Sequence, residues 1–292
     1  SDLALTAFAS LPLAAPAALT TDASERTALW HVRKGLYTAV AGARPSGTTA
    51  LLEDIVVPGD RLLVTCERLI ELFTAHDYGE SVIFGHAKDG NVHFLLSERF
   101  DDPDSLARYR RFTADLVDLV LGQGGSLKAE HGTGRIMAPF VRRQFGDALT
   151  DMMWEIKRLI DPDGILNPGV VLSDDPESYL HHLKQVPTVE GEVDRCVECG
   201  YCEPTCPSKT LTLTPRQRIV LRRDMAAASE RGDEELLAEL RADYDYDGVQ
   251  TCAVDGMCAV ACPVDINTGD LVRRLRAEQA SGVEDGLWDA AA

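Results

Sequence analysis

The sequence lacks the features that would place it in a membrane or on nucleic acid. No run of apolar residues reaches the roughly 18 that a membrane-spanning helix needs. Basic residues are scarce, since 29 Lys and Arg stand against 47 Asp and Glu and the formal net charge is −18. Such a charge argues against nucleic acid or an anionic membrane as the main partner. We therefore expect no nucleic-acid partner and no transmembrane segment.

Signals for export are also missing, and this bears on the cysteines. The Ala- and Leu-rich opening begins Ser1-Asp2 with no basic residue ahead of its apolar part, so it does not fit a secretory signal peptide. We expect a cytoplasmic location, with peripheral attachment to the inner face of the membrane left open. Seven of the eight cysteines fall in two tight clusters. In that compartment, clustered cysteines indicate metal binding more often than disulfides.

The length of 292 residues, 45% of them hydrophobic, suits two globular domains. The first domain, residues 1–172, is expected to be α+β. Its predicted order β-α-β-β-α-β is the ferredoxin-like split unit, an antiparallel sheet with helices on one face and the other face free for a site. The expected strands are 50–57, 81–86, 92–96 and 125–131, and the expected helices begin at Pro58-Gly59 and at Asp102-Pro103, with a further helix at about 147–160.

Two histidines lie close together if the two middle strands form a hairpin. A two-residue turn at Asp89-Gly90 pairs His86 with His93 on one face, with Cβ atoms roughly 5 Å apart. Imidazoles so placed could both reach one divalent cation, although a surface histidine pair is the simpler interpretation. Glu130 and His131 end the last expected strand before a Gly-containing turn, where a third ligand and a base could sit. The topology leaves open whether Glu130 reaches the histidines.

Three motifs in this domain, "GHAKDGNVHF" (85–94), "AEHGTG" (129–134) and "IDPDGILNPG" (160–169), resemble a known family. They are similar to the C-terminal substrate domain of FAD-linked 2-hydroxyacid dehydrogenases of the vanillyl-alcohol-oxidase type. Members include D-lactate and D-2-hydroxyglutarate dehydrogenases. The resemblance implies that a divalent metal, zinc or manganese, is held by His86, His93 and Glu130.

The same resemblance implies roles for three more residues. His131 would act as the general base, Asn167 of the "LNPG" segment would lie near the flavin, and Arg33 of "WHVRKG" would grip the substrate carboxylate. Plainer alternatives stay open for two of them. Asn167, which precedes Pro168, can be a turn residue, and Arg33 can be a solvated surface charge.

The first cysteine cluster, in "CVECGYCEPTCPSK" (196–209), matches the bacterial ferredoxin run, with gaps of two, two and three residues and a proline after the last cysteine. In two-cluster proteins this last cysteine ligates the other cluster. A four-thiolate zinc site is the alternative, but zinc motifs pair their cysteines in twos. We expect one 4Fe–4S cluster at Cys196, Cys199, Cys202 and Cys262, and a second cluster at Cys206, Cys252 and Cys258.

The second motif, "CAVDGMCAVACPVD" (252–265), has Asp255 in the slot where the ferredoxin frame has a cysteine. A carboxylate is a harder ligand than a thiolate and holds cluster iron less firmly. Three outcomes therefore stay open. The second site can hold a 3Fe–4S cluster, a 4Fe–4S cluster with one oxygen-ligated iron, or no cluster at all.

Both motifs belong to a second domain, expected at 193–280 after a linker at 173–192 and before a flexible tail at 281–292. The long stretch between the motifs contains two expected helices. One begins with a capping box at Thr214–Gln217 and the other covers 233–244. This arrangement predicts an all-α helical ferredoxin domain, similar to that of the iron–sulfur subunits of succinate dehydrogenases.

Together the motifs and the resemblance imply a flavin-dependent dehydrogenase that oxidises a D-2-hydroxyacid, D-lactate or D-2-hydroxyglutarate, to the 2-oxoacid. Electrons would pass from FAD through the clusters to a quinone, a cytochrome or a soluble carrier. No Gly-rich phosphate-binding run precedes the first expected strand, so the resemblance implies an upstream FAD domain. We expect this chain to be the middle of a longer enzyme and inactive alone. The alternative is a non-catalytic iron–sulfur electron-transfer subunit with a docking domain.

Overall fold

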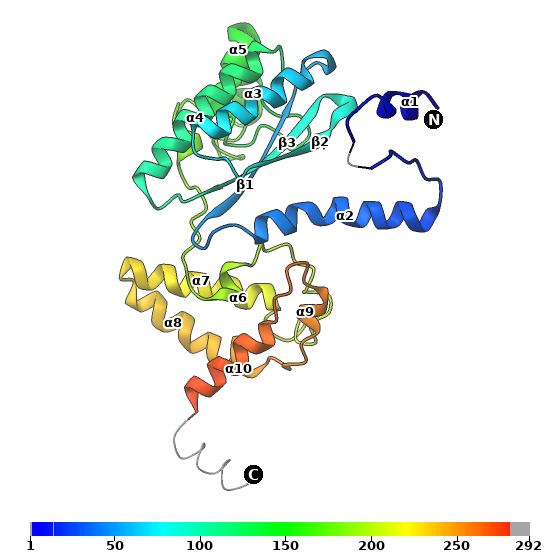
Figure 1. Ribbon diagram of the computed structural model, residues 1–292. Coiled ribbons are helices and arrows are strands. Elements are labelled where there is room, and N and C mark those ends of the chain that lie inside the picture. Colours follow the sequence, from blue (N-terminus) through cyan, green and yellow to red (C-terminus); the bar gives the residue numbers. More distant parts are fainter. Residues whose placement is uncertain (1, 14, 281–292) are drawn as a thin grey trace.

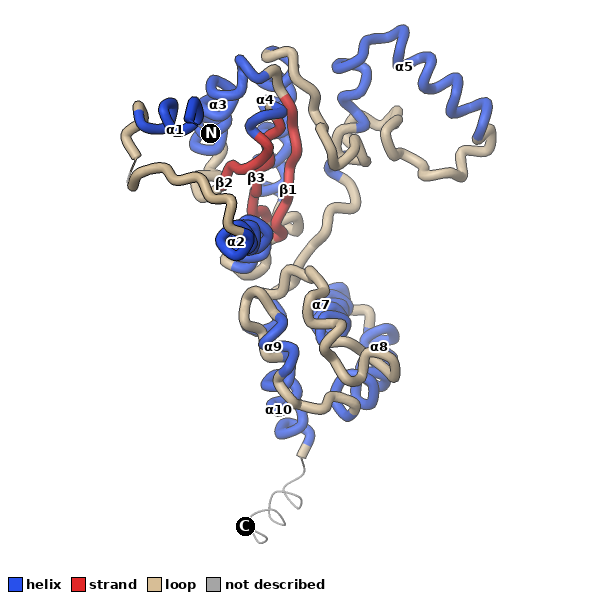
Figure 2. Tube along the Cα trace, turned by 90° about the vertical axis from the view of Figure 1, so that its right-hand side faces the viewer, coloured by secondary structure: helices blue, strands red, loops and turns tan. Residues whose placement is uncertain are grey.

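The computed structural model describes residues 2–13 and 15–280, and the expected tail at 281–292 lies outside these residues. Figure 1 shows a region built on a small sheet, followed along the chain by a helical region. Helix α1 (Asp2–Ala9) precedes the long helix α2 (Ala23–Gly42), which lies between the two regions in both Figure 1 and Figure 2. Among the described residues, no helix is both long and apolar enough to cross a membrane.

The sheet has three antiparallel strands, β1 (Thr49–Val56), β2 (Val82–His86) and β3 (Asn91–Glu98), in the order β1-β3-β2. Helices α3 (Leu62–Ala75) and α4 (Pro103–Gly122) pack on one face. Alternate residues of the strands form the core with these helices because side chains in a strand point to opposite faces in turn. The buried members include Ile55, Leu69, Phe73, Val92, Phe94, Leu96, Phe112 and Leu116.

The opposite face of the sheet carries polar side chains. His93 lies directly opposite Asp54 in β1 and Phe84 in β2, so the three side chains share this face. Helix α2 covers part of it, since the Arg33 guanidinium lies 5.3 Å from the centre of the Phe84 ring. The expected arrangement, an antiparallel sheet with α3 and α4 on one face, is confirmed.

The hairpin between β2 and β3 differs from the prediction. We expected His86 opposite His93, but His86 pairs with Asn91. The cause is a four-residue loop, in which a 3₁₀ turn at Ala87–Asp89 is followed by Gly90 with φ 67°. The register is therefore displaced by two residues along one strand, which keeps both histidines on the same face because the side-chain period of a strand is two.

The strand expected at 125–131 is wrong. Only one bridge forms there, between Ser126 and Val56 at the outer side of β1. Its position makes the spatial order that of a ferredoxin-like sheet whose fourth strand is reduced to a single contact. The backbone beyond Ser126 bonds to a side chain instead of to a neighbouring strand, as described below.

The helix ends follow the expected signals. Asp102 accepts a hydrogen bond from the backbone amide of Ser105, with Pro103 at the first helical position of α4. Helix α5 (Val141–Ile160) is interrupted at Gly146, where φ is 77°, so its second part corresponds to the expected helix at 147–160.

The helical region contains five helices and a short π-helical segment in its described part. The two helices expected between the cysteine motifs begin as predicted, because Thr214 forms a capping box with Gln217 and Asp233 accepts from the amide of Leu236. The predicted fold class is therefore confirmed. The elements are α6 (Gly191–Asp194), α7 (Pro215–Arg231), α8 (Glu234–Tyr244), the π segment Asp245–Gln250, α9 (Met257–Ala261) and α10 (Thr268–Gln279).

The segment between the two regions is packed against the first. Tyr179 and Leu180 are buried beside Phe100 and Tyr109. At the far end, the Arg44 guanidinium donates to the backbone carbonyls of Asp194 (3.0 Å) and Cys196 (3.1 Å). Arg44 directly follows α2 and its C-cap residue, so this contact ties the sheet region to the first cysteine motif.

Candidate functional site

The free face of the sheet brings His86, His93 and Glu130 together. The carboxylate of Glu130 lies 3.2 Å from Nε2 of His86 and 3.0 Å from Nε2 of His93. All three ligand atoms lie within 4.8 Å of one another. His93 is buried while His86 and Glu130 are about half exposed, so the set is open to solvent on one side. The question that the topology left open, whether Glu130 reaches the histidines, is answered by these distances.

A buried carboxylate, Asp54 of β1, holds the loop that carries Glu130. Its Oδ2 accepts hydrogen bonds from the backbone amides of Ala129 (3.0 Å), Glu130 (2.8 Å) and His131 (2.8 Å). Its Oδ1 accepts a fourth bond, of 2.6 Å, from the side-chain amide of Asn91. Asp54 thus takes the place of the missing fourth strand, because it satisfies backbone donors that a sheet ladder would otherwise have paired.

These bonds decide the ionisation of Asp54. Burial by itself would raise the pKa of this carboxyl, but the hydrogen bonds from the His131 amide, the Asn91 side chain and the two other amides outweigh burial and leave the pKa below its ordinary value. Asp54 is therefore a fully buried anion whose negative charge is stabilised by donors of its own chain.

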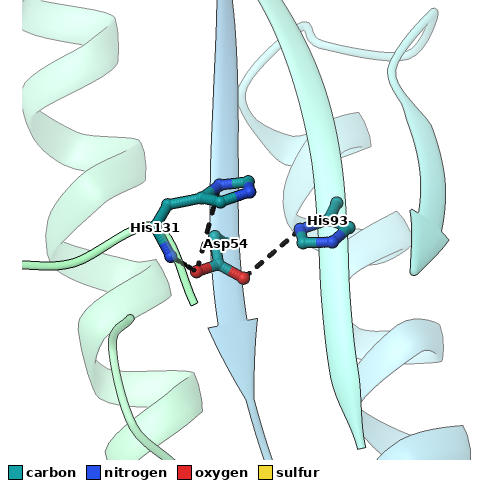
Figure 3. Close-up of side chains that lie close together, drawn as sticks. All are labelled: Asp54, His93 and His131. Carbon is teal, nitrogen blue, oxygen red and sulfur yellow. Dashed lines mark hydrogen bonds and ion pairs between the residues drawn. The ribbon is translucent and has the colours of Figure 1, made fainter. Parts of the chain in front are cut away.

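The same carboxylate faces one of the candidate ligands. Nδ1 of His93 lies 3.3 Å from Oδ1 of Asp54 and, although buried, makes no well-aligned hydrogen bond (Figure 3). Burial lowers the pKa of His93 against the opposing effect of Asp54, which favours the neutral imidazole that metals bind. If a metal bound Nε2, the ring proton of His93 would be on Nδ1, and this N–H could donate a hydrogen bond to Asp54. Carboxylates commonly orient metal-bound histidines in this way.

His131 stacks on His93, with ring centres 4.9 Å apart and the planes inclined by only 8°. Its Nδ1 lies 3.9 Å from Oδ2 of Asp54 and its Nε2 lies 3.9 Å from Glu130, while 39% of its side chain is exposed (Figure 3). Asp54, His93 and His131 form a second set of ligand atoms within 4.8 Å of one another. His131 therefore adjoins the candidate metal ligands and is partly open to solvent.

Two further predicted residues lie at the margins of this site. Arg33 reaches the site face through its contact with Phe84, whose ring centre is 5.4 Å from that of His93. Asn167 is exposed, with φ 44°, in a segment that joins the 131–134 loop through a 2.9 Å bond from the Val171 amide to the Gly134 carbonyl. Arg33 thus adjoins the site through Phe84, while Asn167 is tied to it only through the bond between its segment and the loop that follows His131.

In the helical region, the four cysteines expected to hold the first cluster line one pocket. Its wall also includes Ile219, Pro263 and Ile266, so the space between the thiols is largely apolar. Burial and the neighbouring Cys196 and Cys262 thiols raise the pKa of Cys202 to about 12, which indicates that these sulfur atoms lie near one another. The cysteines of this pocket are Cys196, Cys199, Cys202 and Cys262.

The spacing of the thiols favours a cluster over a single zinc ion. Four thiolates around zinc lie about 4 Å apart, since each Zn–S bond is about 2.3 Å. Within residues 2–13 and 15–280, neither set of three ligand atoms closer than 4.8 Å contains a cysteine. No three of the described thiols therefore lie at the mutual distances of a tetrahedral zinc site.

Two of the three cysteines expected at the second site have polar neighbours. Cys206 is buried, with its sulfur 3.1 Å from the Ser208 hydroxyl and 3.9 Å from a guanidinium nitrogen of Arg218. The Cys258 sulfur lies 3.8 Å from Oδ1 of Asn267. Asp255 is exposed, and its carboxylate accepts a 3.1 Å bond from the Met257 amide. Asp255 therefore already has a loop-forming role in the slot of the absent cysteine.

Sequence reasoning missed Asp54 and Arg218. A signal for Asp54 was present, because Glu53 and Asp54 interrupt an otherwise apolar strand, and an acidic pair in a half-buried strand needs an explanation. Glu53 is explained by a 2.6 Å ion pair with Lys128, and Asp54 by the amides described above. No comparable signal marks Arg218, which is one of four arginines in the first half of α7.

Two family models match separate parts of the chain. Residues 3–171 match the family model described as FAD linked oxidases, C-terminal domain. Residues 192–266 match the model described as a 4Fe-4S dicluster domain. The first match covers more than half of the chain. The second includes all seven cysteines of the two motifs.

Curated relatives resemble the first region. The "Glycolate oxidase subunit GlcD" of Bacillus subtilis is 29% identical over 151 residues, which are 52% of this chain and 31% of the relative. The "Probable D-lactate dehydrogenase, mitochondrial" of Danio rerio is 32% identical over 152 residues, 52% of this chain and 30% of the relative. A "Probable D-2-hydroxyglutarate dehydrogenase, mitochondrial" of Oryza sativa is 30% identical over 169 residues, which are 58% of this chain and 28% of the relative. The chain thus spans about a third of the length of these relatives.

Proposed function

This chain belongs to the FAD linked oxidases, through their C-terminal domain, and from that premise we propose that it is part of a flavin-dependent dehydrogenase. The substrate class is a D-2-hydroxyacid, with D-lactate and D-2-hydroxyglutarate the first candidates, and the product is the 2-oxoacid. The observation that carries the proposal is the convergence of His86, His93 and Glu130 beside His131, in one chain with a 4Fe-4S domain. The names of two relatives support this substrate class, and that of the third names glycolate, the 2-hydroxyacid without a stereocentre.

His86, His93 and Glu130 are the residues that would hold a divalent metal. Two imidazole nitrogens and one carboxylate oxygen are a donor set that suits zinc or manganese. The buried and poorly aligned Nδ1 of His93 fits such a metal as well, because ligation at Nε2 would fix the proton on the side of Asp54. The metal would supply Lewis-acid polarisation of the substrate hydroxyl.

His131 is the residue placed to take the hydroxyl proton. Its Nδ1 side faces the buried Asp54 anion, so a positive charge that forms on the ring is stabilised from that side. The proton would be accepted at Nε2, which lies 3.9 Å from the Glu130 carboxylate. Arg33, whose guanidinium lies over Phe84 beside the histidines, would bind the substrate carboxylate.

FAD would supply the hydride acceptor, and in this proposal it is bound mainly by a domain outside this chain. Asn167 is our candidate for a contact with the flavin, because its segment is bonded to the loop that follows His131. The exposed flank of the metal ligands is the side from which flavin and substrate would approach.

The cysteines would hold two clusters, which provide one-electron transfer. Cys196, Cys199, Cys202 and Cys262 form the first site, and Cys206, Cys252 and Cys258 the second. The acceptor beyond them would be a quinone, a cytochrome or a soluble carrier. Arg44 joins the Cys196 carbonyl to the end of α2, the helix that also carries Arg33, so the first site is the one linked to the hydroxyacid site.

The proposal is tested by metal analysis of the anaerobically purified chain and of His86→Ala. We expect zinc or manganese beside iron in the native chain, and loss of the non-iron metal alone in the variant. His181→Ala is the matched control, since His181 is an exposed histidine paired with Asp175 at 3.1 Å and belongs to neither set of candidate ligand atoms. Iron alone, unchanged in His86→Ala, would favour a non-catalytic electron-transfer subunit instead.

The substrate class is tested separately, in the enzyme that includes the flavin domain. Turnover with D-lactate, D-2-hydroxyglutarate and glycolate should single out one of them, and His131→Gln should reduce kcat by about 10²–10⁴-fold, the usual contribution of a general base. Full activity in His131→Gln would exclude the role given to this residue.

A further inference from the structure

The largest fully buried side chain in the described residues is that of Arg218, an arginine on α7. Its relative exposure is 0%. Arginine stays protonated in proteins, so a full positive charge lies inside the helical region. Removal of such a charge from water costs several kcal/mol, which the surroundings must offset.

The recorded partners of Arg218 do not carry a matching negative charge. Its Nε donates to the Gly248 carbonyl at 2.7 Å, and its Nη2 donates to the hydroxyls of Ser208 (3.0 Å) and Thr251 (3.2 Å). Among residues 2–13 and 15–280, no carboxylate forms an ion pair with it. The fourth partner, at 3.9 Å from Nη1, is the sulfur of Cys206.

Arg223, on the same helix, is a buried arginine that does have a carboxylate partner. It is also buried, with 5% exposure, and it is paired with the carboxylate of Glu198. Its Nη2 donates to the carbonyls of Val193 and Cys196, while its Nε has no hydrogen-bond partner among the described residues. The contrast indicates that Arg218 requires an anion that the carboxylates of the chain do not provide.

The position of Arg218 points to the source of that anion. Ser208 follows Cys206 by two residues and also contacts its sulfur at 3.1 Å, while Thr251 directly precedes Cys252. A bond of 2.6 Å between the hydroxyls of Thr212 and Thr251 joins the same two segments. Arg218 therefore lies where the Cys206 segment meets the Cys252 segment, between two of the three cysteines of the second site.

We propose that Arg218 is the internal counter-cation of the second iron–sulfur cluster. Cysteine thiolates and sulfide give such a cluster a net negative charge, and that charge balances the buried guanidinium. A hydrogen bond from Nη1 to the Cys206 sulfur and a nearby positive charge both favour the reduced cluster, so Arg218 raises its reduction potential. The inference rests on the second cluster of the proposed function, and it makes Arg218 a positioning and tuning residue rather than a ligand.

The first test is an EPR-monitored redox titration of the reconstituted chain and of Arg218→Met. The variant keeps an unbranched, flexible stem and removes the guanidinium with its charge. We expect the midpoint of the second cluster to shift to lower potential while that of the first cluster stays in place, and Arg218→Lys to restore part of the shift. Arg231→Met is the matched control, since it removes the same charge from the exposed end of α7 and should move neither midpoint.

The titration separates two kinds of failure. If the native chain holds the iron and sulfide of only one cluster, the second cluster of the proposed function is absent and the role of Arg218 falls with it. If two clusters are present but both midpoints are the same in Arg218→Met and the native chain, the inference about Arg218 alone is overturned.

The second test covers the case in which Arg218→Met does not retain its second cluster. Thermal unfolding is compared for the native chain and the variant, each with and without iron. With the clusters bound, the variant should unfold at a lower temperature; without them it should unfold at the same or a higher temperature, because the native guanidinium then lacks its anion. A purely structural arginine would instead make the variant less stable in both states, which would overturn the proposal.

Discussion

The two regions of this chain each bury one charge beside a set of candidate ligands, and they satisfy that charge in different ways. In the sheet region, the Asp54 anion is bonded by three backbone amides and the Asn91 side chain. In the helical region, the Arg218 cation finds three neutral oxygens and one sulfur. The first charge is complete without a bound group. The second is complete only if an anion is present.

This difference assigns different tasks to the two charges. Asp54 builds the hydroxyacid site, because it fixes the loop of Glu130 and faces Nδ1 of His93 whether or not a metal is bound. Arg218 joins the Ser208 and Thr251 segments through neutral oxygens, none of which balances its charge. A buried cation without a carboxylate partner is costly to keep, and the proximity of Cys206 gives a physical reason for its presence.

The largest effect that tests this comparison is expected at the cysteines. Cys199→Ser should remove the first cluster, because a hydroxyl is a poor ligand for cluster iron, and the chain should lose about half of its iron and acid-labile sulfide. The zinc or manganese content should stay unchanged, since its ligands belong to the sheet region. Iron, sulfide and divalent metal are measured by chemical analysis and mass spectrometry on one preparation.

Cys66→Ala is the control for this change. Cys66 is the single cysteine outside the two motifs and packs against the core of the sheet region. It should keep both clusters. A Cys199→Ser chain that retains all its iron would contradict the assignment of the first site, and one that also loses the divalent metal would show that the two regions are not independent.

A smaller effect is expected from Asp54→Asn. An asparagine can offer one oxygen to the three amides, but its NH₂ group must then face the Asn91 amide and His93. We expect a loss of about 1–3 kcal/mol in the free energy of unfolding, the usual cost of unsatisfied buried groups. We also expect about 10–100-fold weaker divalent-metal binding, as for other carboxylates that orient a metal-bound histidine.

The two readouts for Asp54→Asn are denaturant unfolding of the metal-free chain and zinc titration of the folded chain. Asp60→Asn provides the control, because Asp60 has a largely exposed side chain just beyond β1. The comparison between regions would be broken by a variant that loses stability only when metal is bound, since Asp54 would then depend on its ligand as Arg218 does.

The sequence predicted those parts of both sites whose residues are close along the chain. The cysteine pocket followed from spacing, because a triplet of cysteines wraps one cluster wherever the domain lies. The two histidines were placed on one face despite the wrong hairpin register, since a shift of two residues preserves the face. The face opposite α3 and α4 was expected to be free, and the polar residues lie there.

What the sequence did not predict depends on contacts between distant segments. Residues 125–131 have a strand-like pattern, but their amides bind the Asp54 carboxylate instead of a neighbouring strand. Glu130 reaches His86 only because of that clamp. The burial of Arg218 depends on the rotation of α7 about its axis and on the fold of the 245–251 segment, and neither is written in the local pattern of charges.

The smallest effect is expected at a third buried charge, the carboxylate of Asp161, which belongs to neither set of candidate metal ligands. It accepts bonds of 2.9 Å from the amides of Ile165 and Leu166, and it pairs with Lys157. The hydrogen bond from Lys157, together with those two amides, holds the pKa of Asp161 below its ordinary value. Its carboxylate therefore shapes the turn that leads to Asn167.

The sign of the pH effect follows from this lowered pKa. Because the folded chain holds the proton less tightly than the unfolded chain, Asp161 stabilises the fold fully above the ordinary carboxyl pKa of about 4, and the contribution is lost as the pH falls through the lower value. The unfolding temperature of Asp161→Asn should thus lie below that of the native chain at pH 7, and the gap should close in acid. Asp163→Asn, in the same turn and exposed, should show no difference in unfolding temperature from the native chain.

A difference for Asp161→Asn that persists unchanged into acid would mean that Asp161 acts through its shape and not its charge, unlike the two buried charges with which it is compared.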